Sequence, residues 1–405
     1  MQPLPLDSDL ARYERQADQL LNAARGGDAR AAQVLRGELH ELRQLSDAAI
    51  GTRVTPQDAR LALARWYDFE SWKGLAAWVV EVTDESSRVG RFERAVEAII
   101  DGDEESLTRI LQSDPELIQM RSRRRHQATL LIYVGANGVE GYRQRTPKNA
   151  VRIAELLLDA GADIEAVGTM YGGTTTLGLV ATSVHPVITG VQEALMEFLL
   201  ARGASFEGAV APDYTDGFLV NACLANGRPG AAEYLFERGA PVNLEGAAAL
   251  GKLDVVQTYF EADGRLKPSA TQTQVRRSFK WACQYGRRAV VEFLLQKGVP
   301  LGQRIEGETG LHQAALGGQS AVVDLLLRNG APTDVRDAEH HATALGWALW
   351  GWSHPSPEGQ HPDYYDVVRR LVAAGAPVES EWLIDEDVRK DSRMVAALTA
   401  NGAAR

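Results

Sequence analysis

The 405-residue chain is poor in cysteine and in long apolar runs, and it lacks excess positive charge; each shortage excludes a class of protein. Its two cysteines, Cys223 and Cys283, cannot form a disulfide framework or a thiolate metal cage, so we expect buried free thiols. No apolar run is long enough to cross a bilayer, and the N-terminus lacks the apolar region of a signal peptide. The sequence therefore predicts a cytoplasmic protein that does not enter a membrane.

The net charge of −11 disfavours binding to the phosphate backbone of a nucleic acid. One local exception is "RSRRRHQ", which groups Arg123, Arg124, Arg125 and His126. We interpret this cluster either as a solvated loop or as a set of contacts for an anion. No helix-spaced metal ligands, phosphate loop or nucleophile motif accompanies it, so the sequence predicts no metal, no cofactor and no catalytic residue.

An internal repeat is the strongest signal in the chain. The block "LLLDAGAD" at 156–163 recurs as "FLLARGAS", "YLFERGAP", "FLLQKGVP", "LLLRNGAP" and "RLVAAGAP". Each block is an apolar helix end followed by a glycine, which accepts the left-handed conformation that ends a helix. A short helix led by a threonine precedes the block, so each repeat is predicted to be a pair of antiparallel helices.

The copy "TGLHQAALGGQSAVVDLLLRNGAP" resembles the ankyrin repeat. The residues at the signature positions are Thr309, Leu311, His312, Ala314, Ala315, Gly318, Leu326 and Gly330. The resemblance implies an all-α solenoid of stacked helix-turn-helix units, which binds partners with the first helices and the protruding fingers. We place about eight repeats within an array at 91–403, with a capping helix near 391–400.

Residues 1–85 precede the array and have good helical periodicity. In the stretch "RVTPQDARLALARWYDFESWKGLAAWV" we expect Thr55 to cap a helix. We also expect the three tryptophans of this stretch, Trp66, Trp72 and Trp78, to lie in the core. The stretch resembles the helical segment found ahead of ankyrin arrays in bacterial proteins. We expect it to cover the apolar face of the first repeat, because the end of a solenoid needs a polar cap.

Three repeats are longer than the others, with insertions near 138–148, 184–190 and 351–363. All three fall between the first and second helix of a repeat, so they are expected to project from one rim. Insertions on one face often mark the binding side. The alternative is tolerated drift, because extending a loop costs only about 0.6 kcal/mol per doubling of its length.

Aromatic residues concentrate in "LGWALWGWSHP" at 345–355. Aligning Thr343 with Thr309 places Trp347 and Trp350 on the groove face of the first helix of the eighth repeat. The same register in the sixth repeat gives Trp281 and Tyr285. We expect these four rings to form the two walls of a slot, unless the tryptophans merely pack along the stack.

A second, polar group of candidate ligand contacts lies in the second and third repeats, close to the arginine cluster. Its members are Tyr133, Asn137, Tyr171, Thr182 and His185. A small oxyanion or a peptide carboxylate would suit such a site, although threonine also opens ankyrin helices for structural reasons.

Two functional hypotheses follow. The first is a non-enzymatic binding protein that recognises a protein or peptide in the groove formed by the first helices, fingers and insertions. The alternative is an enzyme or a receptor for a small anionic or aromatic ligand, with a pocket covered by the insertions. In that case His185, beside tyrosine and threonine hydroxyls, is the candidate for acid–base chemistry.

Overall fold

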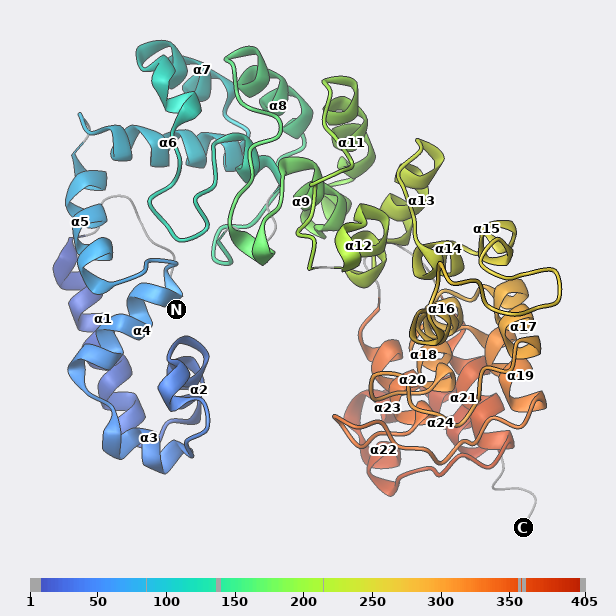
Figure 1. Cartoon of the computed structure of the whole chain (residues 1–405). Helices are drawn as coiled ribbons and strands as arrows, with labels where there is room; N and C mark the ends of the chain where they lie inside the picture. The colour runs from blue at the N-terminus through green and yellow to red at the C-terminus, as the bar shows by residue number, and fades with distance from the viewer. Residues whose placement is uncertain are drawn as a thin grey trace. The chain divides into compact units, whose positions relative to one another are not determined.

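A computed structural model describes residues 9–84, 86–135, 140–213, 215–355, 358 and 362–400. Asn137 and residues 356, 357 and 359–361 of the insertion near 351–363 lie outside the described residues. The described part consists of helices joined by loops and isolated β-bridges (Figure 1). None of its helices combines the length and apolar character needed to span a membrane.

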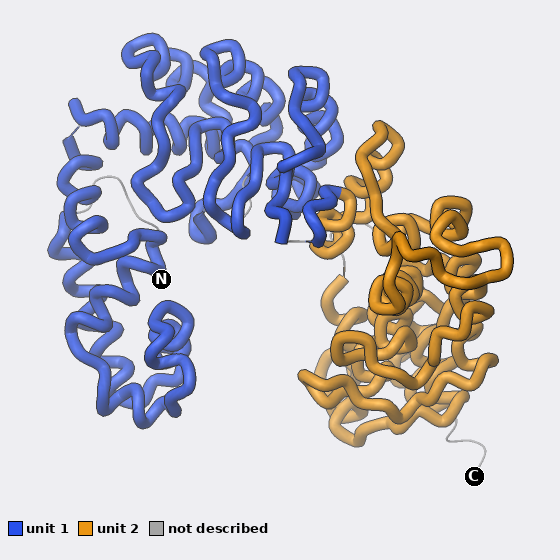
Figure 2. Tube along the Cα trace, viewed as in Figure 1, with its two compact units in different colours: residues 1–219 blue, residues 220–405 orange. Residues whose placement is uncertain are grey.

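The chain divides into two compact units, residues 1–219 and 220–405 (Figure 2). The helical segment predicted at 1–85 belongs to the first unit together with the first repeats. The helices of the first unit are α1 (Leu10–Arg25), α2 (Ala29–Glu38), α3 (Asp47–Arg53), α4 (Pro56–Trp66), α5 (Trp72–Thr83), α6 (Arg88–Asp101), α7 (Glu104–Ser113), α8 (Ala150–Asp159), α9 (Thr176–Thr182), α10 (His185–Thr189) and α11 (Gln192–Ala201), with short 3-10 helices η1 (His40–Leu42), η2 (Pro115–Gln119), η3 (Leu131–Gly135), η4 (Met170–Gly172) and η5 (Thr215–Gly217).

The second unit continues the series of helix pairs. Its helices, the first of which begins at the boundary, are α12 (Leu219–Ala225), α13 (Pro229–Glu237), α14 (Leu244–Leu250), α15 (Leu253–Gln257), α16 (Gln272–Gln284), α17 (Arg288–Gln296), α18 (Gly310–Leu316), α19 (Ser320–Arg328), α20 (Ala344–Ser353), α21 (Tyr364–Ala373), α22 (Ser380–Ile384), α23 (Glu386–Lys390) and α24 (Ser392–Thr399).

Stacking of like helices builds the core of the second unit. The first helices α14, α16, α18 and α20 pack in one row, and the second helices α15, α17, α19 and α21 pack in another (Figure 1). A continuous buried cluster of apolar side chains runs from Leu244 to Leu398 between the rows. Close approach of the first helices requires small residues, since a Cβ on Gly317 would lie 2.1 Å from the Gln284 carbonyl oxygen.

The predicted helix-ending glycines and helix-capping threonines of the repeats are confirmed. The glycines that close the six repeated blocks all have positive φ, between 82° and 97°. Thr309 and Thr343 each cap the helix that follows them through the side-chain oxygen. The backbone thus turns where the repeat pattern predicts.

In the helical segment at 1–85, α4 begins as predicted, with Thr55 at the N-cap and Pro56 in the first turn. Its helix α5 packs against α6. The three tryptophans differ: Trp78 is buried, Trp72 is half-buried, and Trp66 is 43% exposed. The prediction that all three are core is therefore wrong for Trp66, the last residue of α4, whose ring stays largely in contact with solvent although Leu63, one turn earlier, is buried.

Candidate functional site

The second unit contains a cavity of about 880 Å³ beside the first helix of the eighth repeat. Helix α20, the finger at 336–342 and the short helix α22 form its walls. The residues that line it are Leu316, Arg336, His340, His341, Ala342, Gly346, Trp347, Trp350, Glu379 and Trp382.

Three tryptophans border this cavity. Trp350 is 57% exposed and Trp347, one turn earlier on α20, is half-buried. The third, Trp382, comes from α22, and its ring crosses Gly346, where a Cβ would lie 3.3 Å from the Trp382 Cζ2 atom. Glycine at position 346 thus lets the α22 indole lie close to the helix that carries the other two.

Asp337 fixes both the finger and the neighbouring indole. Its buried carboxylate accepts the backbone N–H groups of Glu339, His340 and Ala342 at 2.6–2.9 Å and the indole N–H of Trp347 at 3.1 Å. Burial would raise the pKa of Asp337, but these hydrogen bonds outweigh it and hold the pKa well below its usual value. The chain itself therefore fixes the position of the Trp347 ring.

An ion pair at the base of the finger, between Arg336 and Glu379, forms the polar side of the cavity. The Arg336 guanidinium lies 3.0 Å from the Glu379 carboxylate and donates to the backbone carbonyl of His341 at 2.6 Å. His341 adopts φ of 53°, a left-handed conformation that favours glycine, and its side chain is exposed.

The predicted slot is only half present. Trp347 and Trp350 border the cavity, but Trp281 and Tyr285 are absent from its lining. The Tyr285 hydroxyl donates instead to the backbone carbonyl of Leu224 in α12, so this ring is directed toward the fourth repeat. The opposite aromatic wall is Trp382, which lies beyond the last repeated block.

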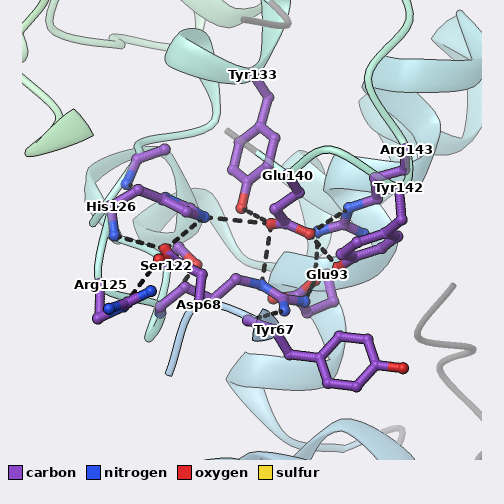
Figure 3. A network of polar contacts seen from close by, with 12 residues as sticks. Tyr67, Asp68, Glu93, Ser122, Arg125, His126, Tyr133, Glu140, Tyr142 and Arg143 are labelled. Carbon is purple, nitrogen blue, oxygen red and sulfur yellow. Dashed lines mark hydrogen bonds and ion pairs between the residues drawn. The ribbon is translucent and has the colours of Figure 1, made fainter. Parts of the chain in front are cut away.

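A second cluster lies in the first unit, around the buried Glu140 of the insertion near 138–148 (Figure 3). This carboxylate accepts the Tyr133 hydroxyl at 2.8 Å and the Tyr142 hydroxyl. It also forms ion pairs with Arg124 at 2.9 Å and with Arg143 at 2.8 Å. His126 Nε2 lies 3.3 Å from the same carboxylate, so five donor side chains surround Glu140.

Glu93 of α6 completes this buried network. It accepts the Trp78 indole N–H at 3.2 Å and pairs with Arg143 at 2.9 Å and Arg124 at 3.4 Å. Arg124 also donates to the backbone carbonyl of Tyr67 at 3.1 Å. The network joins the helical segment, the first repeat and the first insertion.

These contacts argue against an anion clamp in the arginine cluster. Arg124 and His126 are buried, and both face Glu140. Arg123 pairs with Glu81 at 2.9 Å, and Arg125 pairs with Asp68 at 3.0 Å. Neither interpretation of the cluster, a solvated loop or a set of contacts for an anion, included these pairs, because the sequence does not show which acidic residues of the chain the arginines contact.

The polar group predicted in the second and third repeats is also largely occupied by the chain. Tyr133 is buried on Glu140, and the Thr182 hydroxyl donates to the Gly178 carbonyl within α9 at 2.8 Å. The half-buried His185 lies 3.2 Å from the Gln144 side-chain oxygen. Among the members of this group that the structure describes, only Tyr171, 59% exposed, presents most of its side chain to solvent. Their placement argues against one ligand site built from this group.

Comparison with known proteins supports the repeat assignment for part of the chain. Residues 279–381 match the family model for ankyrin repeats in three copies. This stretch carries ankyrin repeats. The fold is an all-α ankyrin-repeat solenoid, and the aromatic cavity lies largely within the matched residues.

Among solved structures, the human ASB11 ankyrin repeat domain is similar, with 19% identity and a TM-score of 0.30. The alignment covers 62% of this chain and 99% of that one. The search of curated proteins finds no match.

Proposed function

We propose that the chain is a non-enzymatic binding protein that recognises a peptide segment of another protein in the aromatic cavity. Ankyrin solenoids use their first helices and fingers as binding surfaces, which supports a binding role. The observation that carries the proposal is the exposure of Trp350 beside Trp347 and Trp382 around one cavity. Tryptophan is enriched among the residues that dominate binding energy, because it offers a large rigid contact area.

The polar groups of the cavity suit a peptide backbone. The exposed side chains of His340 and His341 offer donors and acceptors along one wall, beside the Arg336–Glu379 pair. An apolar cavity with a few fixed polar groups gives both affinity and orientation. Since the finger is held by Asp337, little ordering is required on binding, which favours affinity.

The cavity size also suits a small ligand, since such pockets measure about 300–1,000 Å³. Native mass spectrometry of the purified protein separates the two functions. A retained small molecule that is lost in Trp350→Ala would assign a small-ligand receptor. Retention of none, with peptide binding as described next, supports the peptide-binding function.

The direct test is selection from a displayed peptide library, followed by titration of the selected peptides against three proteins. Wild type and Trp66→Ala should bind alike, because Trp66 is an exposed tryptophan of the other unit. Trp350→Ala should lose at least tenfold in affinity, as truncation of an interface tryptophan does. Peptides that bind all three proteins equally would refute the proposed site.

A further inference from the structure

We propose that the aromatic cavity takes a cationic side chain, lysine or arginine, of the bound segment. This inference rests on the proposed function and specifies the residue that the partner inserts. It follows from the electrostatics of the indole rings, the charges around the cavity and the ion pair inside it.

The rings provide the first argument. Three indoles border one cavity, and the face of an indole attracts a cation more strongly than the face of any other side chain. His354 stacks on Trp350 with ring centroids 4.4 Å apart and planes 11° apart, which covers one face of that ring. The rest of the Trp350 ring remains open, and the apolar stem of a lysine or arginine can lie along it.

The surrounding charge provides the second argument. The residues that line the cavity and their immediate sequence neighbours include four acidic residues, Asp337, Glu339, Glu379 and Glu381, against one arginine, Arg336. Glu379 lines the cavity, and the exposed Glu381 and Glu339 lie on the two elements that frame it. A negative potential at an aromatic surface favours a cationic partner and disfavours an anionic one.

The ion pair inside the cavity makes the inference testable. Glu379 already binds one guanidinium, that of Arg336, at 3.0 Å. An incoming lysine or arginine therefore either shares this carboxylate or displaces Arg336 from it. Removal of the Arg336 charge should strengthen the binding of a cation, whereas it should weaken the binding of an anion.

The experiment uses the full chain and a set of nine-residue alanine-rich peptides whose central residue is lysine, arginine, norleucine or glutamate. Tryptophan fluorescence reports binding. The lysine and arginine peptides should bind on the order of tenfold more tightly than the norleucine peptide, which has a similar stem without charge. Binding should weaken with added salt.

Variants separate a cation site from a merely apolar one. For the lysine peptide, Arg336→Gln should tighten binding and Glu379→Gln should weaken it, while Trp66→Ala should have no effect. Far-ultraviolet circular dichroism and melting curves establish that each variant is folded. If Arg336→Gln fails to fold, Arg336→Met, which keeps an unbranched stem without the charge, takes its place and should likewise tighten binding of the lysine peptide.

Equal binding of the norleucine and lysine peptides, preference for glutamate, or weaker binding of lysine to folded Arg336→Gln would overturn the inference. The proposed function would survive those results if binding still depended on Trp350. The absence of any Trp350-dependent peptide from the library selection would instead contradict the proposed function itself.

Discussion

Replacement of Glu140 by glutamine tests whether the buried network in the first unit is structural. Glutamine keeps the shape of the side chain but removes the negative charge, and its amide NH₂ would face groups that are themselves donors. Arg124 and Arg143 would then share Glu93 as their buried acidic partner. Removing one partner of a buried ion pair costs about 3–5 kcal/mol, because the remaining charge stays desolvated.

The matched control is Glu97→Gln. Glu97 also pairs with Arg143, at 2.6 Å, but its side chain is 37% exposed. Because the Glu97 carboxylate stays in contact with water and Arg143 keeps Glu93 and Glu140 as partners, loss of this pair should cost only about 0–1 kcal/mol. Native-state hydrogen exchange, resolved by segment, should show α5 and α6 losing about 3–5 kcal/mol of protection in Glu140→Gln and no more than about 1 kcal/mol in the control. Equal effects would refute a structural role for the network.

The lowered pKa of Glu140 predicts that the first unit loses stability in acid. Burial would raise the pKa of Glu140, but Arg124, Arg143 and the hydrogen bond from His126 outweigh it and hold the pKa well below 4.5. A lowered folded-state pKa contributes stability that is complete above the unfolded value and is lost as pH falls through the folded one. Stability of the first unit should therefore fall below pH 4.5, and Glu140→Gln should show a weaker dependence there. Identical acid profiles would contradict the assignment.

Three further predictions concern the second unit. Cys223 and Cys283 are buried with pKa values raised by burial, so alkylating reagents should modify them only after unfolding; rapid modification of the native protein would contradict this burial. Asp337→Ala should lower stability by about 1–3 kcal/mol in denaturant titrations, because it leaves several partly buried donors unpaired, and should abolish binding at Trp347; unchanged stability would show that the finger keeps its conformation without this carboxylate. Gly317→Ala should cost about 1–3 kcal/mol by forcing the first helices apart, and a wild-type melting temperature would disprove that contact.

The repeat architecture was predictable because its cause is local. The glycine after each apolar helix end and the threonine before each first helix act within a few residues of their position, so the sequence shows them directly. The register of Thr343 also placed Trp347 and Trp350 correctly on the exposed side of α20, since helix periodicity carries a position forward reliably.

The contents of the site were less predictable because they depend on distant segments. Trp382 follows the last closing glycine outside any recognisable repeat, and only the packing of α22 against Gly346 brings it to the cavity. Asp337 is visible in the sequence as an acidic residue at the base of a finger. Its hydrogen bond with the Trp347 indole joins the finger to the next helix, so the sequence does not predict that contact. Glu140 lies in an insertion without periodicity, so its five donors could not be assigned to it from the sequence.

The central claim, that a partner binds at the tryptophan cavity, is tested most directly by fluorine NMR of the protein labelled with 5-fluorotryptophan. The eight tryptophans give separate probes, each assigned by substitution. Addition of a selected peptide should shift the resonances of Trp347, Trp350 and Trp382 and leave those of Trp72 and Trp78 unchanged. Shifts confined to the tryptophans of the first unit, with the cavity resonances unmoved, would contradict the claim.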